Sequence, residues 1–114
     1  MTRNKWGVRS EQAALLEQLE QLSRNEIGIV TSIENETVGV MVDGDDVVGL
    51  RLSGCYLTEL PGSIDNLRSL RELNLIYNEL TALPDSMGAL HSLVELDLEG
   101  NGFSNIFNYY LFKK

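Results

Sequence analysis

The chain has 114 residues and a net charge of −8, because 17 acidic side chains outnumber 9 basic ones. This length suits one domain with a single modest core. The acidic balance argues against nucleic acid and against an anionic membrane surface as partners, since both require a basic footprint. A basic protein surface is the better electrostatic match.

The sequence carries no signal for export or for membrane insertion. Residues 1–10 are polar and basic with no apolar run behind them, unlike a secretory signal. No stretch approaches the roughly 18 apolar residues of a membrane helix. The single cysteine cannot form a disulfide within the chain. We therefore expect a cytoplasmic protein.

The first predicted element is a helix over residues 11–23. Ser10 can serve as its N-cap, and Glu11 lies in the first turn, where a negative charge is favourable. A one-sided apolar stripe predicts that the helix packs on another element; it consists of Leu15, Leu16, Leu19 and Leu22. The polar side is expected to face water and consists of Gln12, Glu17, Gln18, Glu20 and Gln21.

Two strand-like segments follow at residues 27–33 and 38–42, and each shows the alternation of a half-buried strand. We expect them to form a β-hairpin over residues 27–42. A second break at residues 43–46 contains an Asp-Gly pair, which favours a tight turn, so the sheet is expected to continue into the next residues. Residues 1–46 would then be an N-terminal cap that shields the first unit of a repeated structure.

From Val47 onward, one hydrophobic pattern occurs three times with a period of 23 residues. The units span residues 47–69, 70–92 and, incompletely, 93–106. Each contains a Leu-x-Leu segment that predicts a short strand with inward leucines, stacked in parallel on the next; the segments are Leu50–Leu52, Leu73–Leu75 and Leu96–Leu98. After Pro61 and Pro84, apolar residues at every third position predict a short helical or 3₁₀ turn. The expected fold class is α/β.

The position at which the chain leaves each strand is Cys55, Asn78 or Asn101. A buried asparagine has donors and an acceptor that can pair with backbone groups left unsatisfied by the strands. Asn78 and Asn101 are therefore expected to form a ladder between units. Cys55 has only a weak thiol for this role.

Catalytic or metal-binding chemistry finds little support in the sequence. Cys55 could be a nucleophile, but its register places it inside the fold, where structural thiols are inert. His91, the only histidine, is one donor where a metal site needs three or four. The acidic turn at residues 43–46 lacks the 12-residue spacing of a calcium loop. We therefore expect no enzymatic activity, no cofactor and no metal.

The side chains that flank the inward leucines are expected to line the other side of the strands. They form an acidic field around two bulky residues, Ile76 and Tyr77, as in an interface anchor within a charged rim. The predicted protein-binding residues are Arg51, Glu72, Asn74, Ile76, Tyr77, Glu95, Asp97 and Glu99. The alternative is that any strand face carries such residues by chance.

Aromatic and aliphatic side chains crowd residues 107–114, where a fourth unit would begin. This segment either folds back as a cap or presents an apolar surface to a second chain or a partner. The second interpretation allows a homodimer that forms through the C-terminal end.

The pattern of residues 47–106 resembles the leucine-rich repeat family, whose repeats form a solenoid. The resemblance is closest to the Leu-Pro-containing, intracellular, Ras-associated type. It is carried by Leu60-Pro61-x-x-Ile64-x-x-Leu67, Leu83-Pro84-x-x-Met87-x-x-Leu90 and Leu73-x-Leu75-x-x-Asn78-x-Leu80. The N-terminal helix and hairpin also resemble short leucine-rich repeat proteins of prokaryotes. The sequence departs from the family pattern where Cys55 replaces Asn and Met87 replaces Ile.

The resemblance implies a right-handed horseshoe scaffold that binds proteins on its concave strand face without a cofactor. Small GTPases and kinases are frequent partners of such scaffolds. We therefore expect a non-catalytic protein-binding module, although fewer than three full units leave a small concave face. The alternative function is a structural unit that self-associates through its aromatic C-terminal end or through a sheet edge.

Overall fold

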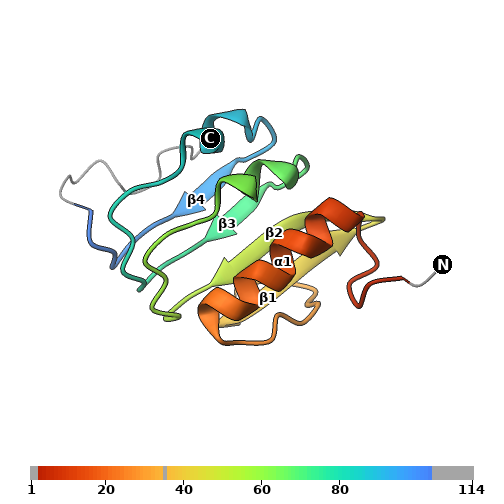
Figure 1. Cartoon of the computed structure of the whole chain (residues 1–114), viewed down its shortest axis with the longest axis horizontal. Coiled ribbons are helices and arrows are strands. Elements are labelled where there is room, and N and C mark those ends of the chain that lie inside the picture. Colours follow the sequence, from red (N-terminus) through yellow and green to blue (C-terminus); the bar gives the residue numbers. More distant parts are fainter. Residues whose placement is uncertain (1–2, 35, 104–114) are drawn as a thin grey trace.

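The structure, a computed structural model, describes residues 3–34 and 36–103. Figure 1 shows the order of the helices and strands in these residues. The elements are α1 (Ser10–Ser23), β1 (Val38–Asp43), β2 (Asp46–Leu52), the 3₁₀ helix η1 (Gly62–Asn66), β3 (Glu72–Asn74), the 3₁₀ helix η2 (Asp85–Ala89) and β4 (Glu95–Asp97). Helix and sheet together confirm the predicted α/β class. The end of the third predicted unit, 104–106, and the predicted tail, 107–114, lie outside the described residues.

The strands form one sheet in the order β1-β2-β3-β4. β1 and β2 pair antiparallel, and Gly44 in the turn between them has a φ of 64°, which suits the first central position of a tight hairpin turn. β2, β3 and β4 run parallel, in a register that places Leu73 between Leu50 and Leu96. The 23-residue period of the sequence is therefore the step from one parallel strand to the next.

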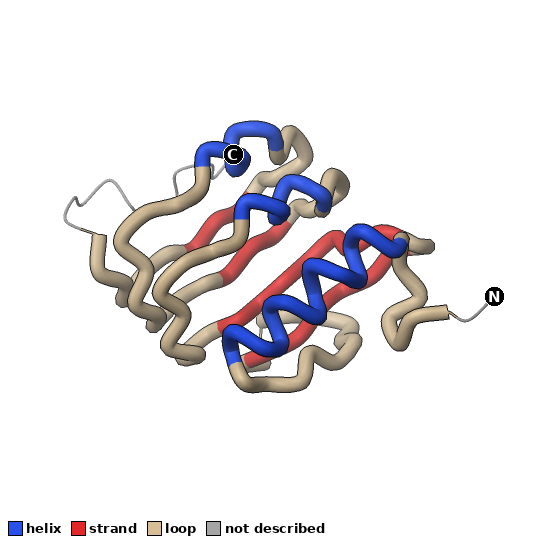
Figure 2. The backbone as a smooth tube through the Cα atoms, in the orientation of Figure 1, coloured by secondary structure: helices blue, strands red, loops and turns tan. Residues whose placement is uncertain are grey.

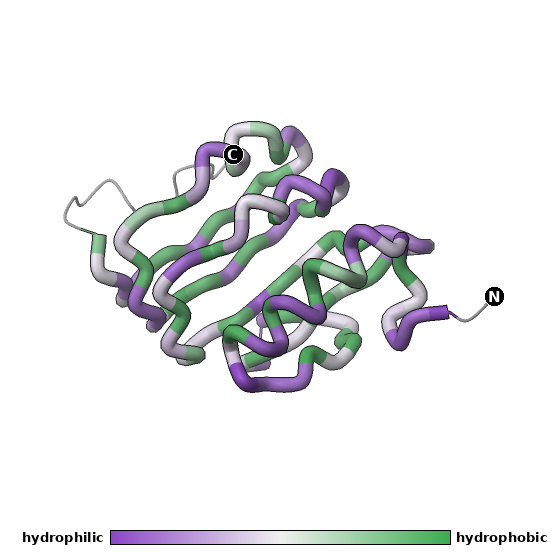
Figure 3. Tube along the Cα trace, in the orientation of Figure 1, coloured by the Kyte–Doolittle hydropathy of each residue, from purple (hydrophilic) through white to green (hydrophobic). Residues whose placement is uncertain are grey.

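Alternate side chains of each strand point to opposite faces of the sheet. On the inner face, leucines of β2, β3 and β4 join leucines of α1 in one buried core. α1 packs on β2 and beside η1, and η1 packs beside η2 (Figures 1 and 2). Figure 3 shows hydrophobic and hydrophilic residues alternating along the strands. We call the side of the sheet opposite this core the outer face.

The return segments that follow β2 and β3 are 3₁₀ helices that begin directly after a proline. The N–H of Ile64 donates to the carbonyl of Pro61 at 3.1 Å, and the N–H of Met87 donates to that of Pro84 at 3.0 Å. A 3₁₀ helix has three residues per turn, so side chains three positions apart point in the same direction. Ile64 in η1 and Met87 in η2 are both directed into the core. The predicted short helical turns are confirmed.

Asn78 and Asn101 connect neighbouring repeats through their side-chain amides, as predicted. The Oδ1 of Asn78 accepts from the N–H groups of Cys55 and Leu57, at 3.0 and 3.1 Å. The Oδ1 of Asn101 accepts from the N–H of Leu80 at 3.0 Å. Both side chains also donate to a carbonyl of the preceding repeat and to one of their own repeat. The ladder thus satisfies turn backbone that no strand partner reaches.

The start of α1 differs from the prediction, whereas its last residue, Ser23, is the predicted one. Arg9, not Ser10, occupies the N-cap, because the N–H of Gln12 donates to the carbonyl of Arg9 and the helix begins one residue earlier. The N–H of Arg9 in turn donates to the carbonyl of Asp45 at 3.0 Å, which ties the helix start to the β1–β2 turn. Leu22, the last residue of the predicted apolar stripe, remains 42% exposed.

Gln12 lies on the predicted polar side of the helix, yet its side chain is only 1% exposed. Its Oε1 accepts from the N–H of Val47 at 2.8 Å, and its Nε2 donates to Asp46 at 3.0 Å. The prediction is wrong because the amide of Val47, buried in β2, needs an acceptor, and α1 lies close enough to supply one.

The predicted hairpin over residues 27–42 is also wrong, since residues 27–33 form no strand. A single bridge joins Ile29 to Val40 of β1, and it is parallel. The observed hairpin joins β1 to β2 instead. Ile29 is 54% exposed while Ile27 is buried, so the alternation in the sequence does not correspond to two faces of a strand.

The start of this segment is tied to the N-terminal region rather than to β1. The indole N–H of Trp6 donates to the carbonyl of Ile27 at 2.7 Å, and the N–H of Ile27 donates to the carboxylate of Glu20 at 2.7 Å. Burial raises the pKa of Glu20, but hydrogen bonds from Lys5 and Ile27 and the charge of Lys5 leave it below its ordinary value. These contacts satisfy the backbone of Ile27 in place of a strand partner.

Candidate functional site

The strand register determines which predicted binding residues are neighbours on the outer face. Glu72 of β3 lies beside Glu95 of β4. In the next row, Arg51, Asn74 and Asp97 lie side by side across β2, β3 and β4. The structure therefore brings residues from three repeats together, as their common register predicts.

Arg51 is the exception among them, because it serves the fold. Its Nη1 donates to the carbonyls of Ile33 and Glu34, at 3.1 Å each. The same segment covers the neighbouring strand, where the Val30 side chain lies 2.9 Å from the place a Cβ would occupy at Gly39. Half-buried Arg51 thus holds residues 30–34 against β1 and β2, and the open part of the outer face lies over β3 and β4.

Four carboxylates dominate this open part: Glu72, Glu95, Asp97 and Glu99. Glu95 and Glu99 are exposed, and Glu72 and Asp97 are half-buried. The ion pairs found in residues 3–34 and 36–103 all involve other carboxylates. Like charges on neighbouring strands repel, so the group costs some stability and generates a negative potential.

Tyr77 follows β3 and has an unusual backbone conformation for a residue of its size. Its φ is 57°, and the equivalent residues of the other two repeats, Gly54 and Gly100, have φ values of 65° and 77°. The turn therefore requires left-handed backbone, which costs about 1–2 kcal/mol for a residue with a side chain. Tyr77 nevertheless occupies the position and is 61% exposed.

The ring of Tyr77 lies against the next repeat. The N–H of Tyr77 donates to the carbonyl of Glu99 at 2.8 Å, and a Cβ at Gly100 would collide with the Tyr77 ring. Half-buried Ile76 precedes it, with its N–H donating to Oδ1 of Asn74 at 3.2 Å. The glycines in register with Tyr77 were a sequence signal for this backbone strain.

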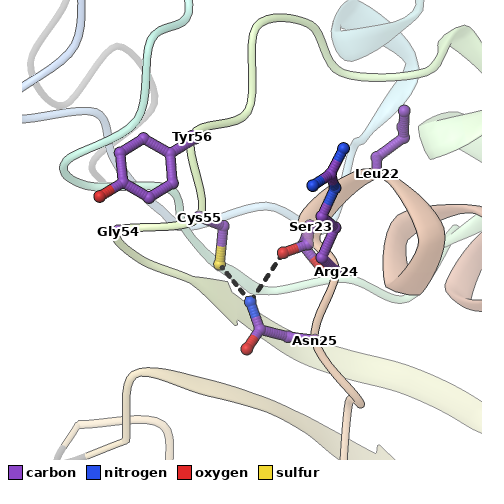
Figure 4. A pocket seen from close by; sticks show the side chains of 7 residues that line it. All are labelled: Leu22, Ser23, Arg24, Asn25, Gly54, Cys55 and Tyr56. Carbon is purple, nitrogen blue, oxygen red and sulfur yellow. Dashed lines mark hydrogen bonds between the residues drawn. The ribbon is translucent and has the colours of Figure 1, made fainter.

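A second feature, absent from the sequence prediction, is a hollow of about 560 Å³ between the end of α1 and the turn after β2 (Figure 4). Its lining residues are Leu22, Ser23, Arg24, Asn25, Gly54, Cys55 and Tyr56. Tyr56 is 80% exposed and, like Arg24, has left-handed backbone. The N–H of Gly54 donates to the carbonyl of Ile76 at 3.1 Å, so the hollow adjoins the turn that carries Tyr77.

Cys55 belongs to the wall of this hollow. Its thiol donates to the carbonyl of Ser53 at 3.4 Å and accepts from Nδ2 of Asn25 at 3.6 Å, the second contact being visible in Figure 4. Burial raises the pKa of the Cys55 thiol, and the hydrogen bond from Asn25 offsets this only in part. A thiol with a raised pKa stays protonated at neutral pH and is a weak nucleophile.

The rest of the described chain offers little other chemistry. In residues 3–34 and 36–103, no three or more His, Cys, Asp or Glu side chains are grouped so that they could hold a metal ion. His91 is exposed in the segment that leads to β4. No helix of this part of the chain has the length and apolar character needed to cross a membrane.

Comparison with known proteins shows which family this chain resembles. The family described as "Leucine rich repeat" matches residues 47–103, half of the chain. Curated proteins give no significant match. Among solved structures, the chain is similar to a chain in the crystal structure of the BIR3–SERK2 complex from Arabidopsis thaliana, with 27% identity and a TM-score of 0.52. The match covers 74% of this chain and 48% of that one, so this chain spans about half the length of its structural relative.

Leucine-rich repeat domains generally mediate protein–protein interaction, and the family is typically non-catalytic. The described residues agree with the match, since leucines stack in register across β2, β3 and β4 and the asparagines of successive repeats form a ladder. With half of its length matched by the family, this chain belongs to the leucine-rich repeat proteins.

Proposed function

We propose that this chain is a non-catalytic protein-binding module whose contact surface is the outer face over β3 and β4. Ile76 and Tyr77 are the anchor of this surface, and Glu72, Glu95, Asp97 and Glu99 form its rim. Arg51 is left out, because its guanidinium is engaged by the carbonyls of Ile33 and Glu34. The observation that carries the proposal is the exposed Tyr77 on left-handed backbone.

Tyr77 supports a binding role because the backbone conformation of this turn does not require its side chain. Glycine occupies the equivalent position in both other repeats, and it adopts the same φ without strain. A tyrosine at this position costs stability and buries less than half of its surface. Strained residues persist where they serve a site, and tyrosine is enriched among the residues that dominate binding energy.

The carboxylates support a partner with a basic surface. Charges around an interface steer the encounter and raise the association rate, and this effect weakens as salt increases. The family resemblance adds small GTPases and kinases as candidate partner classes. A protein partner is consistent with the structural relative, which was crystallised in the BIR3–SERK2 complex.

The proposal extends to the shape of the molecule. The repeats curve as a short right-handed solenoid with the outer face concave, and residues 1–46 cap its first repeat. The parallel register of β2, β3 and β4 supports the solenoid. The packing of α1 on β2 and η1 supports the cap. Small-angle X-ray scattering from the purified chain tests the shape. A scattering profile that does not fit a curved solenoid would reject it.

The binding test compares Tyr77→Gly with Tyr56→Gly. Both changes remove an exposed ring from left-handed backbone, but only Tyr77 lies at the proposed surface. With a partner captured by the intact chain and then purified, calorimetry should show that Tyr77→Gly weakens binding by on the order of 1–2 kcal/mol. Tyr56→Gly should leave the affinity unchanged. Equal losses, or a loss only for Tyr56→Gly, would refute the anchor.

A second variant tests the rim. Replacing Glu95, Asp97 and Glu99 by their amides should slow association and flatten its salt dependence, with a smaller effect on dissociation. Stopped-flow measurement at two salt concentrations separates the two rates. An unchanged association rate would remove the carboxylates from the surface.

Self-association is the second candidate function, favoured by the edge of β4, which no strand pairs within residues 3–34 and 36–103. The aromatic C-terminal end, its other proposed contact, lies outside the described residues. Sedimentation of the purified chain over a concentration series decides between the two functions. A monomer at all concentrations leaves only the binding module.

A further inference from the structure

Asn101 and Gly102 follow β4 and form the only Asn-Gly pair in the sequence. The other asparagine of the ladder, Asn78, is followed by Glu79 instead. In a flexible peptide, a backbone nitrogen can attack the side-chain amide carbon of the asparagine that precedes it. Glycine has no side chain to hinder this approach and allows the bent backbone that the attack requires. Asn101 is therefore the more reactive of the two ladder asparagines by sequence.

In the folded chain, hydrogen bonds hold both of the groups that would react. The N–H of Gly102 donates to the carbonyl of Leu80 at 2.8 Å. The Oδ1 of Asn101 accepts from the N–H of Leu80 at 3.0 Å. Its Nδ2 donates to the carbonyls of Leu75 and Leu98, at 2.8 and 2.9 Å. An amide nitrogen must lose its proton before it attacks, and a hydrogen-bonded amide loses its proton when the structure opens locally, so the ladder protects Asn101.

Once these contacts open, the reaction has a defined course. The nitrogen of Gly102 bonds to Cγ of Asn101 while the Cγ–Nδ2 bond breaks, and Nδ2 leaves as ammonia with the proton of the Gly102 amide. Water from the solvent then opens the cyclic imide at either of its carbonyls. One opening gives aspartate, and the other gives isoaspartate, in which the main chain runs through the side-chain carboxyl carbon. One water is added and one ammonia released, with no oxidation or reduction.

Either product disrupts the end of the ladder. Aspartate and isoaspartate are ionised at neutral pH, and a carboxylate accepts hydrogen bonds but donates none. The carbonyls of Leu75 and Leu98 therefore lose their donors and face a negative charge. The N–H of Tyr77 donates to the carbonyl of Glu99 in the same turn, so this contact should weaken as well.

We infer that Asn101 is a site of spontaneous deamidation whose rate is set by local opening of the turn after β4. Asn78 forms the equivalent contacts in the preceding repeat but reacts more slowly, because the side chain of Glu79 hinders the attack. The reaction needs only water, and it removes the last described rung of the ladder permanently. This inference does not depend on the proposed function.

The test follows the purified full chain at mildly alkaline pH by mass spectrometry, with proteolytic peptides that assign each converted asparagine. The folded chain is compared with the same chain in denaturant. Conversion of Asn101 should be at least about tenfold slower in the folded chain, which corresponds to an opening free energy of about 1.4 kcal/mol or more. Hydrogen exchange of the Gly102 amide measures this opening independently, and its protection should be of similar size.

Gly102→Ala is the matched control for the role of glycine. A Cβ at position 102 would lie 3.4 Å from the carbonyl oxygen of Leu80 and from Cγ2 of Thr81, an ordinary contact, and the backbone there is not left-handed. Alanine should therefore fit the fold. In denaturant, the substitution should slow conversion of Asn101 towards the rate at Asn78.

Asn101→Asp reproduces one of the two products. This variant should exchange the amides of Gly102 and Tyr77 faster than the native chain. Asn66→Asp adds the same charge at the end of η1, away from the ladder, and should leave both amides unchanged.

Other outcomes overturn the inference. Equal conversion in the folded chain and in denaturant would show that the ladder does not protect Asn101. No conversion of Asn101 in denaturant, a rate there equal to that of Asn78, or an unchanged rate in Gly102→Ala would reject the site. If Asn101→Asp and Asn66→Asp exchange the two amides alike, the product fits the ladder and the inferred loss of the rung is wrong.

Discussion

The N-terminal region, from α1 to β2, and the repeats from β2 to β4 are held together by different kinds of contact. In the repeats, equivalent residues make equivalent contacts, as when Leu73 lies between Leu50 and Leu96. In the N-terminal region, each contact occurs once and joins residues far apart in the chain, as when Gln12 accepts from Val47. The comparison shows that the repeats are stabilised by one set of contacts that recurs every period. The N-terminal region depends instead on individual contacts, each made by one pair of residues.

The largest expected effect comes from a substitution in the core of the repeats. Leu75→Ala removes a side chain that is 0% exposed in the middle repeat, so neighbouring leucines cannot fill the space without moving. The free energy of unfolding should fall by roughly 2–5 kcal/mol in denaturant titration. Leu22→Ala is the matched control, because Leu22 is 42% exposed and should lose much less. Similar losses at both positions would contradict the buried register.

The asparagine ladder should give the next largest effect. Asn78→Ala leaves the amides of Cys55 and Leu57 without their side-chain acceptor, and unpaired buried groups cost about 1–3 kcal/mol. Asn66 lies at the end of η1, away from the ladder, so Asn66→Ala should change the free energy of unfolding by less than about 0.5 kcal/mol. Denaturant titration of both variants measures the difference, and its absence would refute the ladder.

Gln12 tests a contact of the N-terminal region that occurs only once. Gln12→Leu leaves the N–H of Val47 without its acceptor, and the expected loss is about 1–2 kcal/mol in the free energy of unfolding. Hydrogen exchange should show faster exchange at Val47 and little change at Leu75. The exposed Gln18 provides the control variant, Gln18→Leu. Equal acceleration at Val47 and Leu75 would mean that the two regions unfold as one unit.

The smallest effect concerns the pH dependence of the N-terminal region. The pKa of Glu20 is lower in the folded chain than its ordinary value of 4.5, because the hydrogen bonds from Lys5 and Ile27 outweigh the effect of burial. Its contribution to stability is therefore present above that ordinary value and is lost as the pH falls through the folded value. Unfolding curves of the native chain and of Glu20→Gln should converge under acid. A constant difference between them would contradict the shift.

Most of the repeat structure could be predicted because its sequence signals are local and recur. The leucine spacing predicted the buried residues of β2, β3 and β4, and the register of Asn78 with Asn101 predicted the ladder. The prolines before η1 and η2 marked where the return helices begin. The same register predicted that Glu72 lies beside Glu95.

The candidate site was predicted only in part. Tyr77 and the carboxylates lie where their register places them, but Arg51 is engaged by residues 33 and 34, and no local pattern shows that these residues would reach it. The hollow beside Tyr56 was missed for a similar reason, since its walls come from α1 and from the turn after β2.

Periodicity determined the repeats of this protein, because a contact that holds between two repeats holds again one period later. The tertiary structure decided the rest, because a polar group is buried or exposed according to which distant partner meets it. Gln12 is a polar residue on the predicted solvent side of its helix, yet it is buried because the N–H of Val47 needs an acceptor. Residues 27–33 have the alternation of a strand, yet Trp6 and Glu20 satisfy the backbone of Ile27 where a strand partner was expected.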